Sequence, residues 1–173
     1  SNTLKVGICG YGTVGSGTLA LLQGNAKEIT RKTGVEIEVY RVASRSLQVD
    51  IAGVTYSGTD PFEVAGDDEV DVVVEAMGGF DPAFEVVKKA LENGKHVVTA
   101  NKALIAERGA ALIELAEQKG VTLAYESAVA GGIPIVKALR EGLAANRIDW
   151  LAGIINGTGN FILSEMMDKQ REF

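Results

Sequence analysis

Three glycines near the start of the chain, Gly10, Gly12 and Gly15, have the spacing of a loop that binds the phosphates of a dinucleotide. An apolar run precedes them and apolar residues at helical spacing follow, which predicts the order strand, glycine turn, helix. We expect Gly10 to allow the tight turn, Gly12 to let the backbone approach a pyrophosphate, and Gly15 to let the helix lie close to the strand. A helix that begins at Thr13 or Val14 would then offer free amides and the positive end of its dipole to phosphate.

The residues after the second expected strand, 35–43, bear on which dinucleotide is bound. An NAD site usually has an acidic residue here, which accepts hydrogen bonds from the ribose hydroxyls. This chain has Ser44 and Arg45 instead. Because an arginine binds a phosphate through a forked pair of donors, we expect NADP(H) to be preferred over NAD(H), with Arg45 as the main contact and Ser44 as a helper. Two alternatives remain open: Arg45 is a solvated loop residue, or Arg41 takes its role.

The third expected strand, 70–76, ends at two residues that could line the same site, Met77 and Gly78. In an open parallel sheet, ligands collect at the carboxyl ends of the strands, and small residues there let the cofactor approach the backbone. We therefore expect Met77 and Gly78 to contact the cofactor. Glu75, near this end, either holds a hydroxyl group of the ligand or anchors the loop.

The fourth expected strand, 95–99, brings Thr99 and Lys102 to this edge of the sheet. We expect Thr99 to contact the cofactor and Lys102 to face the nicotinamide. A lysine in that position can orient a substrate hydroxyl, stabilise negative charge or take part in proton transfer, so Lys102 is the candidate catalytic residue. His96 lies early in the strand, far from this edge, and is expected to be structural.

Alternation of strands and helices over the first 125 residues predicts an α/β fold of the Rossmann type, a doubly wound parallel sheet with right-handed crossovers. We expect a dinucleotide-binding domain over residues 1–130 and, over 131–173, the start of a second α+β lobe for substrate binding and dimerisation. The first helix is expected to run unbroken over 14–32, and residues 48–60 to form a loop or a small excursion. The other expected helices span 61–65, 81–93 and 103–119, and a fifth strand spans 121–125.

Composition narrows the classes of function. The chain has 173 residues, a net charge of −6 and one histidine, and no basic stripe, which argues against a nucleic-acid surface. No apolar run approaches the length of a membrane span and no charged-then-apolar leader is present, so we expect a cytoplasmic protein. The single cysteine, Cys9, is interpreted as a buried thiol rather than a nucleophile. Because the chain lacks an initiator Met and stops within a helical pattern, we expect it to be part of a longer protein.

The segment from Glu126 to Pro134 combines small residues with two glycines before an expected helix. Such a loop can turn several carbonyl oxygens inward, as an alkali or alkaline-earth cation requires. A tight connection between two lobes is the simpler interpretation of the same residues.

Five segments, taken together, resemble the N-terminal part of the homoserine dehydrogenase family. Thr-Ala-Asn-Lys at 99–102 and Asn-Gly-Thr at 156–158 are more specific than the glycine spacing. The matching segments span nearly the whole chain in order, at 10–15, 75–79, 96–102, 126–134 and 153–163.

The resemblance implies a reversible, NAD(P)-dependent interconversion of L-homoserine and L-aspartate 4-semialdehyde in the synthesis of threonine, methionine and isoleucine. It implies that Gly12, Thr13, Val14 and Gly15 hold the pyrophosphate and that Lys102 lies beside cofactor and substrate. It also implies that the second lobe supplies a substrate pocket and the contacts of a homodimer. A sodium ion would be held by main-chain oxygens of Glu126, Val129, Gly131 and Ile133.

The chain departs from the family pattern in two ways. Gly159 stands where the family commonly has a second Thr, and the downstream Asp, Lys and substrate-binding Glu have no counterpart before the chain ends. We therefore expect these residues to bind NADPH but to turn over homoserine poorly or not at all. Two other functions stay open: a nucleotide-sensing module without catalysis, and another NADP-dependent enzyme such as aspartate-semialdehyde dehydrogenase, which would need a cysteine nucleophile that Cys9 is poorly placed to supply.

Overall fold

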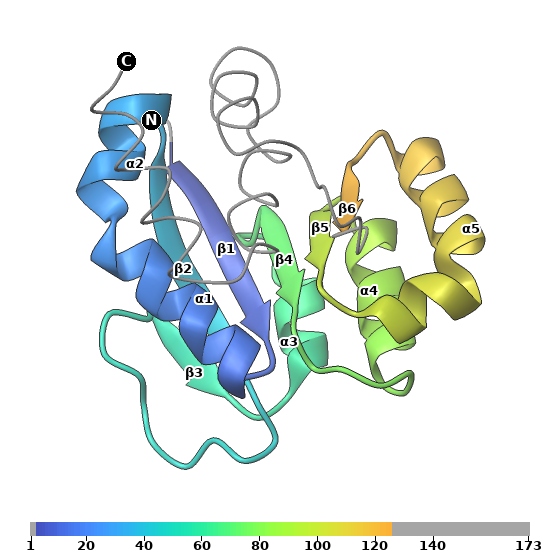
Figure 1. Cartoon of the computed structure of the whole chain (residues 1–173), viewed down its shortest axis with the longest axis horizontal. Coiled ribbons are helices and arrows are strands. Elements are labelled where there is room, and N and C mark those ends of the chain that lie inside the picture. Colours follow the sequence, from blue (N-terminus) through green and yellow to red (C-terminus); the bar gives the residue numbers. More distant parts are fainter. Residues whose placement is uncertain (1–2, 126–173) are drawn as a thin grey trace.

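In the computed structural model, which describes residues 3–125, the chain forms one six-stranded parallel sheet (Figure 1). The strand order is β3-β2-β1-β4-β5-β6, the order of a doubly wound dinucleotide-binding fold, so the predicted fold class is confirmed. The strands are β1 (Thr3–Cys9), β2 (Glu36–Ala43), β3 (Tyr56–Gly58), β4 (Val72–Glu75), β5 (His96–Thr99) and β6 (Leu123–Tyr125).

Helices cover both faces of the sheet (Figure 1). On one face lie α1 and α2, and on the other lie α3, α4 and α5. This arrangement follows from right-handed crossovers that run outward from β1 in both directions. The helices are α1 (Thr13–Gly24), α2 (Ala26–Thr33), α3 (Pro61–Gly66), α4 (Ala83–Glu92) and α5 (Lys102–Lys119).

Strands β1 and β4 lie side by side at the centre of the sheet, although 62 residues separate Cys9, the end of β1, from Val72, the start of β4. The chain leaves β1 toward β2 on one side and later returns to β4 on the other. The carboxyl ends of β1 and β4 therefore flank the point where the strand order reverses, which is where open α/β sheets bind ligands.

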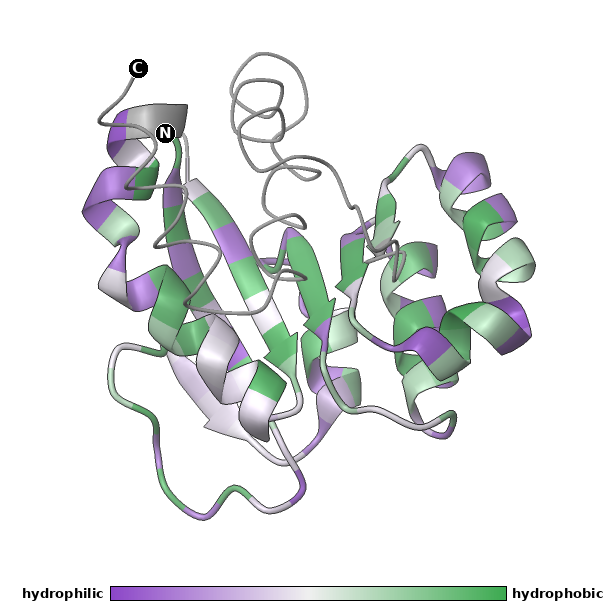
Figure 2. Cartoon of the chain, in the orientation of Figure 1, coloured by the Kyte–Doolittle hydropathy of each residue, from purple (hydrophilic) through white to green (hydrophobic). Residues whose placement is uncertain are grey.

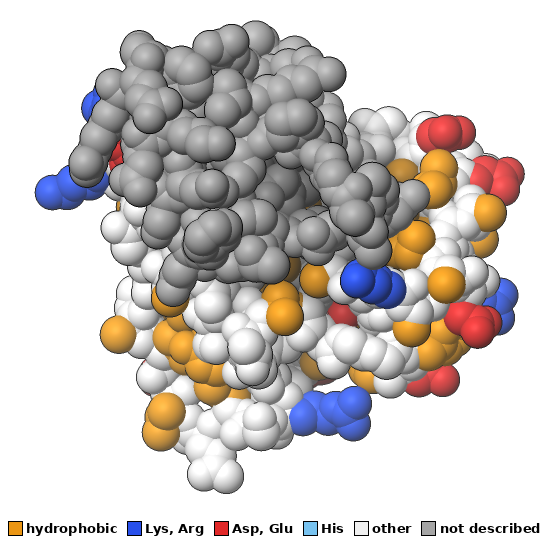
Figure 3. Space-filling model, viewed as in Figure 1, with side chains coloured by type: hydrophobic (Ala, Val, Ile, Leu, Met, Phe, Trp, Pro, Cys, Tyr) orange, Lys and Arg blue, Asp and Glu red, His pale blue; other side chains and the backbone are white. Residues whose placement is uncertain are grey.

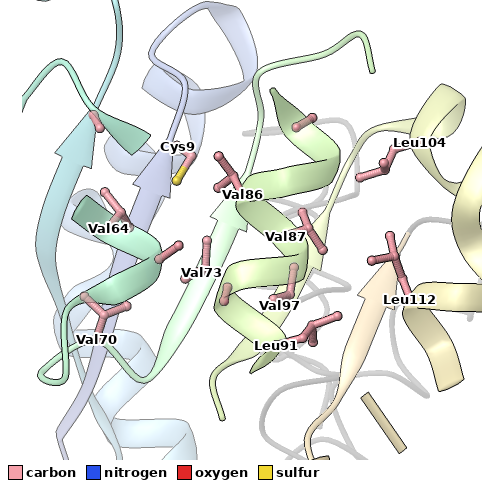
Figure 4. Close-up of a cluster of buried hydrophobic side chains, with 14 of the residues drawn as sticks. Cys9, Val64, Val70, Val73, Val86, Val87, Leu91, Val97, Leu104 and Leu112 are labelled. Atoms are coloured by element: carbon pink, nitrogen blue, oxygen red, sulfur yellow. The ribbon is translucent and has the colours of Figure 1, made fainter. Parts of the chain in front are cut away.

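Alternating strand residues divide the core into two clusters, one on each face of the sheet, and the apolar sequence of β4 appears green in Figure 2. Val72 and Val74 of β4 pack with the α1 and α2 side, whereas Val73 faces α3 and α4. Both faces of the central strands are buried, which explains their nearly continuous apolar sequences. Figure 4 shows the second cluster, in which Cys9 and Val73 of the sheet lie beneath side chains of α3, α4 and α5.

The prediction of one unbroken helix over 14–32 is wrong, because Asn25 interrupts it. Asn25 has non-helical backbone angles (φ −121°, ψ 17°). It is both the C-cap residue of α1 and the N-cap residue of α2. Its side-chain Nδ2 donates a hydrogen bond to the carbonyl of Leu21 at 3.0 Å. Gly24 and Asn25 are poor helix formers, and this side-chain bond offers the backbone an alternative to continuing the helix.

Residues 48–60 were expected to form a loop or a small excursion, and the structure places the short strand β3 within them. Three residues, Tyr56–Gly58, pair in parallel with Arg41 to Ala43 at the edge of the sheet. So short a strand leaves little periodic signal. Other boundaries were predicted well: Asp60 caps α3, with Pro61 in its first turn, and Gly120 ends α5 with a positive φ of 66°.

The expected second lobe, the domain boundary at residue 130 and the cation loop from Glu126 to Pro134 all lie outside the described residues. Among the helices within 3–125, none has the combination of length and apolar sequence that crossing a membrane requires.

Candidate functional site

The glycine turn lies where β1, β2 and β4 end together. The amide of Gly10 donates a hydrogen bond to the carbonyl of Ala43 at the end of β2, at 2.8 Å. Gly10 has a φ of +105°, and a Cβ at this position would lie 2.6 Å from the carbonyl oxygen of Ala76. The turn therefore requires glycine both for its backbone angle and for the close approach to the chain leaving β4.

The second and third glycines meet different surroundings. A Cβ on Gly15 would lie 1.9 Å from the carbonyl oxygen of Gly10, so α1 packs directly on the turn. A Cβ on Gly12 would meet no atom within 4 Å, so this side of the turn is open. Close packing at Gly15 is the role that the sequence predicted for it, and the open space at Gly12 leaves room for the pyrophosphate expected there.

The start of α1 is arranged differently from the starts of α3 and α5. Gly12 bounds the helix without a side-chain hydrogen bond, and the first turn contains no acidic residue. Asp60 and Asn101, in contrast, cap α3 and α5 through their side chains. The amides at the start of α1, from Thr13 to Gly15, thus have no side-chain acceptor from the capping position, and an anion would fit there.

Ser44 and Arg45 follow β2 directly beside this turn. The amide of Ser44 donates to the carbonyl of Gly58 at 3.0 Å, which fixes the backbone at this point, and its hydroxyl lies 3.4 Å from that of Ser46. Arg45 is exposed, and within residues 3–125 no carboxylate forms an ion pair with it. A guanidinium at the end of β2 is thus available to an anionic group.

Arg41, the alternative to Arg45, is committed elsewhere. Its guanidinium forms ion pairs with Asp67 and, at 3.7 Å, with Glu63, and it lies over the ring of Tyr56. Burial alone would raise the pKa of Asp67, but hydrogen bonds from Arg41 and from the amide of Glu69 outweigh it and lower that pKa. Arg41 is therefore a structural residue that fastens the turn after α3 to the sheet.

Glu75 is a fully buried anchor between β4 and β5. One carboxylate oxygen accepts a hydrogen bond from the amide of Met77 at 2.8 Å, and the other accepts one from the hydroxyl of Thr99 at 2.7 Å. Of the two roles considered for Glu75, the structure supports anchoring of the loop. The hydroxyl of Thr99 also accepts from the amide of Asn101 at 3.0 Å, so it is used within the protein.

Met77 and Gly78 begin a short loop at the carboxyl end of β4. Gly78 and the following Gly79 both have positive φ, at 74° and 69°, and a Cβ on either would meet no atom within 4 Å. The loop therefore exposes backbone at the edge of the sheet, next to the glycine turn after β1.

Lys102, the candidate catalytic residue, is the first residue of α5 and is exposed. No carboxylate of the described chain pairs with it. A positive charge in the first turn of a helix is unfavourable, since the helix dipole favours negative charge there. Stability alone does not explain a lysine here, but a role toward a ligand would.

Cys9 is sealed from this edge by burial, and His96 lies at the other end of its strand. The thiol of Cys9 is buried, 3.7 Å from the carbonyl oxygen of Pro61, and burial raises its pKa far above the usual range. A thiol in this environment is a poor nucleophile, so Cys9 does not fit the cysteine mechanism of an aspartate-semialdehyde dehydrogenase. His96 begins β5 at the opposite end of the strand and accepts a hydrogen bond from the amide of Thr122 through Nδ1 at 3.1 Å.

Asn101 is the site residue that the sequence analysis did not single out. Its side chain caps α5 by accepting from the amide of Leu104 at 3.0 Å, and it donates to the carbonyl of Gly79 at 2.6 Å. An asparagine immediately before a helix is a recognised capping signal, so the first contact was predictable. The second was not, because it joins segments 22 residues apart.

Charged side chains give this molecule no single basic surface in the view of Figure 3. On the described part of that face, Lys and Arg side chains stand apart from one another rather than in one patch. Arg45 and Lys102 would therefore act as individual cations toward a ligand.

Two family models match the chain. Residues 10–126 match a family model described as "Homoserine dehydrogenase, NAD binding domain", and residues 134–173 match one described as "Homoserine dehydrogenase". A homoserine dehydrogenase of Pseudomonas aeruginosa is 60% identical over 171 residues, covering 98% of this chain and 39% of the relative. One from Neisseria gonorrhoeae is 53% identical over 172 residues, covering 98% of this chain and 40% of the relative.

Solved structures agree with the sequence comparison. A homoserine dehydrogenase from Thiobacillus denitrificans superposes with a TM-score of 0.69 at 54% identity, covering 84% of this chain and 34% of that one. One from S. aureus, solved at pH 7.0, has a TM-score of 0.65 at 36% identity, covering 72% of this chain and 33% of that one. The chain thus spans about two fifths of the length of the curated relatives it matches.

Proposed function

The chain belongs to the homoserine dehydrogenase family, and from this premise we propose that it is the nucleotide-binding part of an oxidoreductase that interconverts L-homoserine and L-aspartate 4-semialdehyde with NADP(H). The observation that carries the proposal is that the glycine turn and Lys102 lie at the same edge of the sheet, within the residues that match an NAD-binding domain. The reaction would serve the synthesis of threonine, methionine and isoleucine, in the cytoplasm.

The residues at the end of β1 fit the pyrophosphate of a dinucleotide. Gly12 presents open backbone, and the start of α1 has neither a side-chain cap nor an acidic residue. Amides of Thr13, Val14 and Gly15 would donate to phosphate oxygens, and the helix dipole would add a favourable field. Gly10 and Gly15 let these groups converge by allowing turn and helix to touch.

Arg45 supports NADP(H) over NAD(H). It stands at the end of β2, where a dinucleotide fold places the adenine ribose, and residues 3–125 offer it no carboxylate partner. Its guanidinium would bind the 2′-phosphate through two donors, with the hydroxyl of Ser44 as a further donor. No acidic residue stands at this position to repel that phosphate.

Lys102 supplies the positive charge beside the reacting groups. When bound, the nicotinamide supplies the hydride donor or acceptor of the reaction. The ammonium of Lys102 would donate a hydrogen bond to the substrate oxygen, orient it and stabilise negative charge that develops on it. The backbone of Met77 and Gly78 would border the same space.

The rest of the active site is assigned to residues beyond those described. Following the family pattern, a downstream lysine and aspartate would carry out proton transfer, and a downstream glutamate would bind the substrate. Main-chain oxygens of Glu126, Val129, Gly131 and Ile133 would hold a sodium ion, and the second lobe would supply homodimer contacts.

The proposal is tested by comparing this chain with one extended to the full length of its relatives. We expect both to bind NADPH in a titration of nucleotide fluorescence. Only the extended chain should reduce NADP⁺ at a robust rate when L-homoserine is added. Turnover of homoserine by residues 1–173 alone would contradict the assignment of proton transfer to downstream residues, and an extended chain without homoserine-dependent activity would overturn the proposed reaction.

A further inference from the structure

Backbone and side-chain groups of Asn101 make hydrogen bonds to three different parts of the candidate site. Its amide donates to the hydroxyl of Thr99, its Oδ1 accepts from the amide of Leu104, and its Nδ2 donates to the carbonyl of Gly79. Asn101 is 6% exposed; its bonds with Thr99 and Leu104 are buried, and its bond to Gly79 is partly buried. A helix cap needs only the second of them.

The two other bonds complete a closed frame. Thr99 donates to Glu75, and Glu75 accepts from the amide of Met77, where the glycine loop begins. Asn101 holds the same loop two residues later, at Gly79. The loop between these points is therefore fastened at both ends to one buried network that also contains the start of α5.

A third contact fixes the chain just after the loop. The rings of Phe80 and Phe84 stack with centroids 5.7 Å apart, and the guanidinium of Arg108 lies 5.6 Å and 5.3 Å from the two centroids. Arg108 belongs to α5, so this stack also links the loop to the helix that carries Lys102. The stack is partly exposed, and it adds to the buried hydrogen bonds of Glu75, Thr99 and Asn101, a kind of network that restricts the positions available to its members.

Gly78 and Gly79 would be the most adaptable part of the loop without these contacts, because glycine has wide backbone freedom. The bond from Asn101 to Gly79 removes part of that freedom. It also sets the position of the loop relative to Lys102, the residue that directly follows Asn101.

We propose that Asn101 is a positioning residue that holds the backbone of the Met77–Gly79 loop and Lys102 in one fixed relation, so that the hydrogen bond to Gly79, and not the helix cap, matters for turnover. The proposal rests on the proposed function, which places both groups beside the reacting atoms. Misplacement of such groups by about 1 Å can cost on the order of a hundredfold in rate.

Asn101→Asp separates the two roles. Aspartate caps a helix as well as asparagine, so the bond from Leu104 is kept, but a carboxylate oxygen would face the carbonyl of Gly79 without a proton to donate. Asn101→Ser is a second variant, because a serine hydroxyl can cap the helix but is too short to replace the whole amide. Asp60→Asn is the matched control: it changes the same groups at the cap of α3, where the side chain accepts from the amide of Phe62.

Two measurements on the chain extended to the length of its relatives test the inference. We expect kcat for homoserine oxidation to fall about 10- to 100-fold in both Asn101 variants, while the Kd of NADPH stays within about threefold of wild type, because the phosphates are held at α1. Asp60→Asn should leave both values unchanged. Hydrogen exchange without nucleotide should accelerate at residues 78–80 in Asn101→Asp, while the amide of Leu104 stays protected.

An unchanged kcat, or a Kd that weakens as much as kcat falls, would overturn the positioning role and leave the proposed function standing. The positioning role would also be overturned if hydrogen exchange at the loop did not change and kcat fell only in proportion to the folded fraction, measured by thermal unfolding. A wild-type protein that binds neither NADPH nor NADH would overturn the proposed function and this inference together.

Discussion

Gly15 and Gly10 are in direct contact, since a Cβ on Gly15 would lie 1.9 Å from the carbonyl oxygen of Gly10. The two residues belong to α1 and to the turn after β1, so the contact brings the helix start to the carboxyl end of the central strands. No flexible side chain is available to move aside, because the obstructing atom is backbone.

Gly15→Ala should therefore destabilise the fold. The added methyl group would separate α1 from the turn, and we expect the free energy of unfolding to fall by about 1–3 kcal/mol or more, as in other overpacked positions. Gly17→Ala in the same helix is the control, because its Cβ would meet no atom within 4 Å. Gly17→Ala should raise the free energy of unfolding by about 0.5–1 kcal/mol, because alanine has a higher helix propensity than glycine. Urea unfolding measures both, and equal effects would contradict the packing described.

Gly12→Ala should weaken nucleotide binding without loss of stability. Its φ of −81° suits alanine and its Cβ would enter open space, so we expect the free energy of unfolding to stay within about 0.5 kcal/mol. The methyl group would lie where the pyrophosphate approaches the backbone, and the Kd of NADPH should rise at least about tenfold, or about 1.4 kcal/mol. A titration that shows the same Kd as wild type would remove Gly12 from the phosphate site.

Lys102→Ala should lower activity and raise stability. In a chain of full family length, we expect kcat to fall about 10²- to 10³-fold because a charged donor to the reacting oxygen is lost. Removing a cation from the first turn of α5 should stabilise the fold by about 0.3–1 kcal/mol. Lys119→Ala, in the last turn of α5, is the control and should keep the activity while losing a favourable dipole contact. Activity retained by Lys102→Ala would exclude Lys102 from catalysis.

His96 should make stability depend on pH. Burial lowers the pKa of His96 below 6.5, and the charge of Asp71 opposes this only in part. The unfolded chain therefore binds a proton more readily, so stability is retained above about pH 6.5 and falls as the pH is lowered through the folded pKa, by at most about 1.4 kcal/mol per pH unit. His96→Asn keeps an acceptor for the amide of Thr122 and should flatten the dependence of thermal unfolding between about pH 7 and 5. The same slope in both proteins would contradict the assignment.

Local signals predicted much of this fold. Gly34 and Gly120, with φ of 74° and 66°, end α2 and α5 where the sequence placed the helix ends, and Asp60 caps α3 as expected. Each depends on a few neighbouring residues. The break at Asn25 was missed because apolar spacing continues across it and hides a short capping contact.

Contacts between distant segments could not be predicted in the same way. Arg41 pairs with Asp67, 26 residues away, and its contacts with distant residues distinguish it from Arg45 as a candidate phosphate ligand. Thr99 was expected to contact the cofactor, and its donation to Glu75 depends on the register between β4 and β5. Sequence spacing located the edge of the sheet that forms the site, whereas the tertiary structure determined which side chains at that edge are already engaged.

We propose that Arg45 recognises the 2′-phosphate of NADP(H) beside the start of α1. The most direct test is the Kd of NADPH and of NADH for wild type, Arg45→Ala and Arg31→Ala, the last removing an exposed arginine paired with Glu28. We expect Arg45→Ala to weaken NADPH about 10- to 100-fold, the loss of a charged hydrogen bond of about 1.5–3 kcal/mol, and to leave NADH unchanged. Arg31→Ala should change neither. An unaltered Kd of NADPH in Arg45→Ala, or an equal loss for both nucleotides, would contradict the claim.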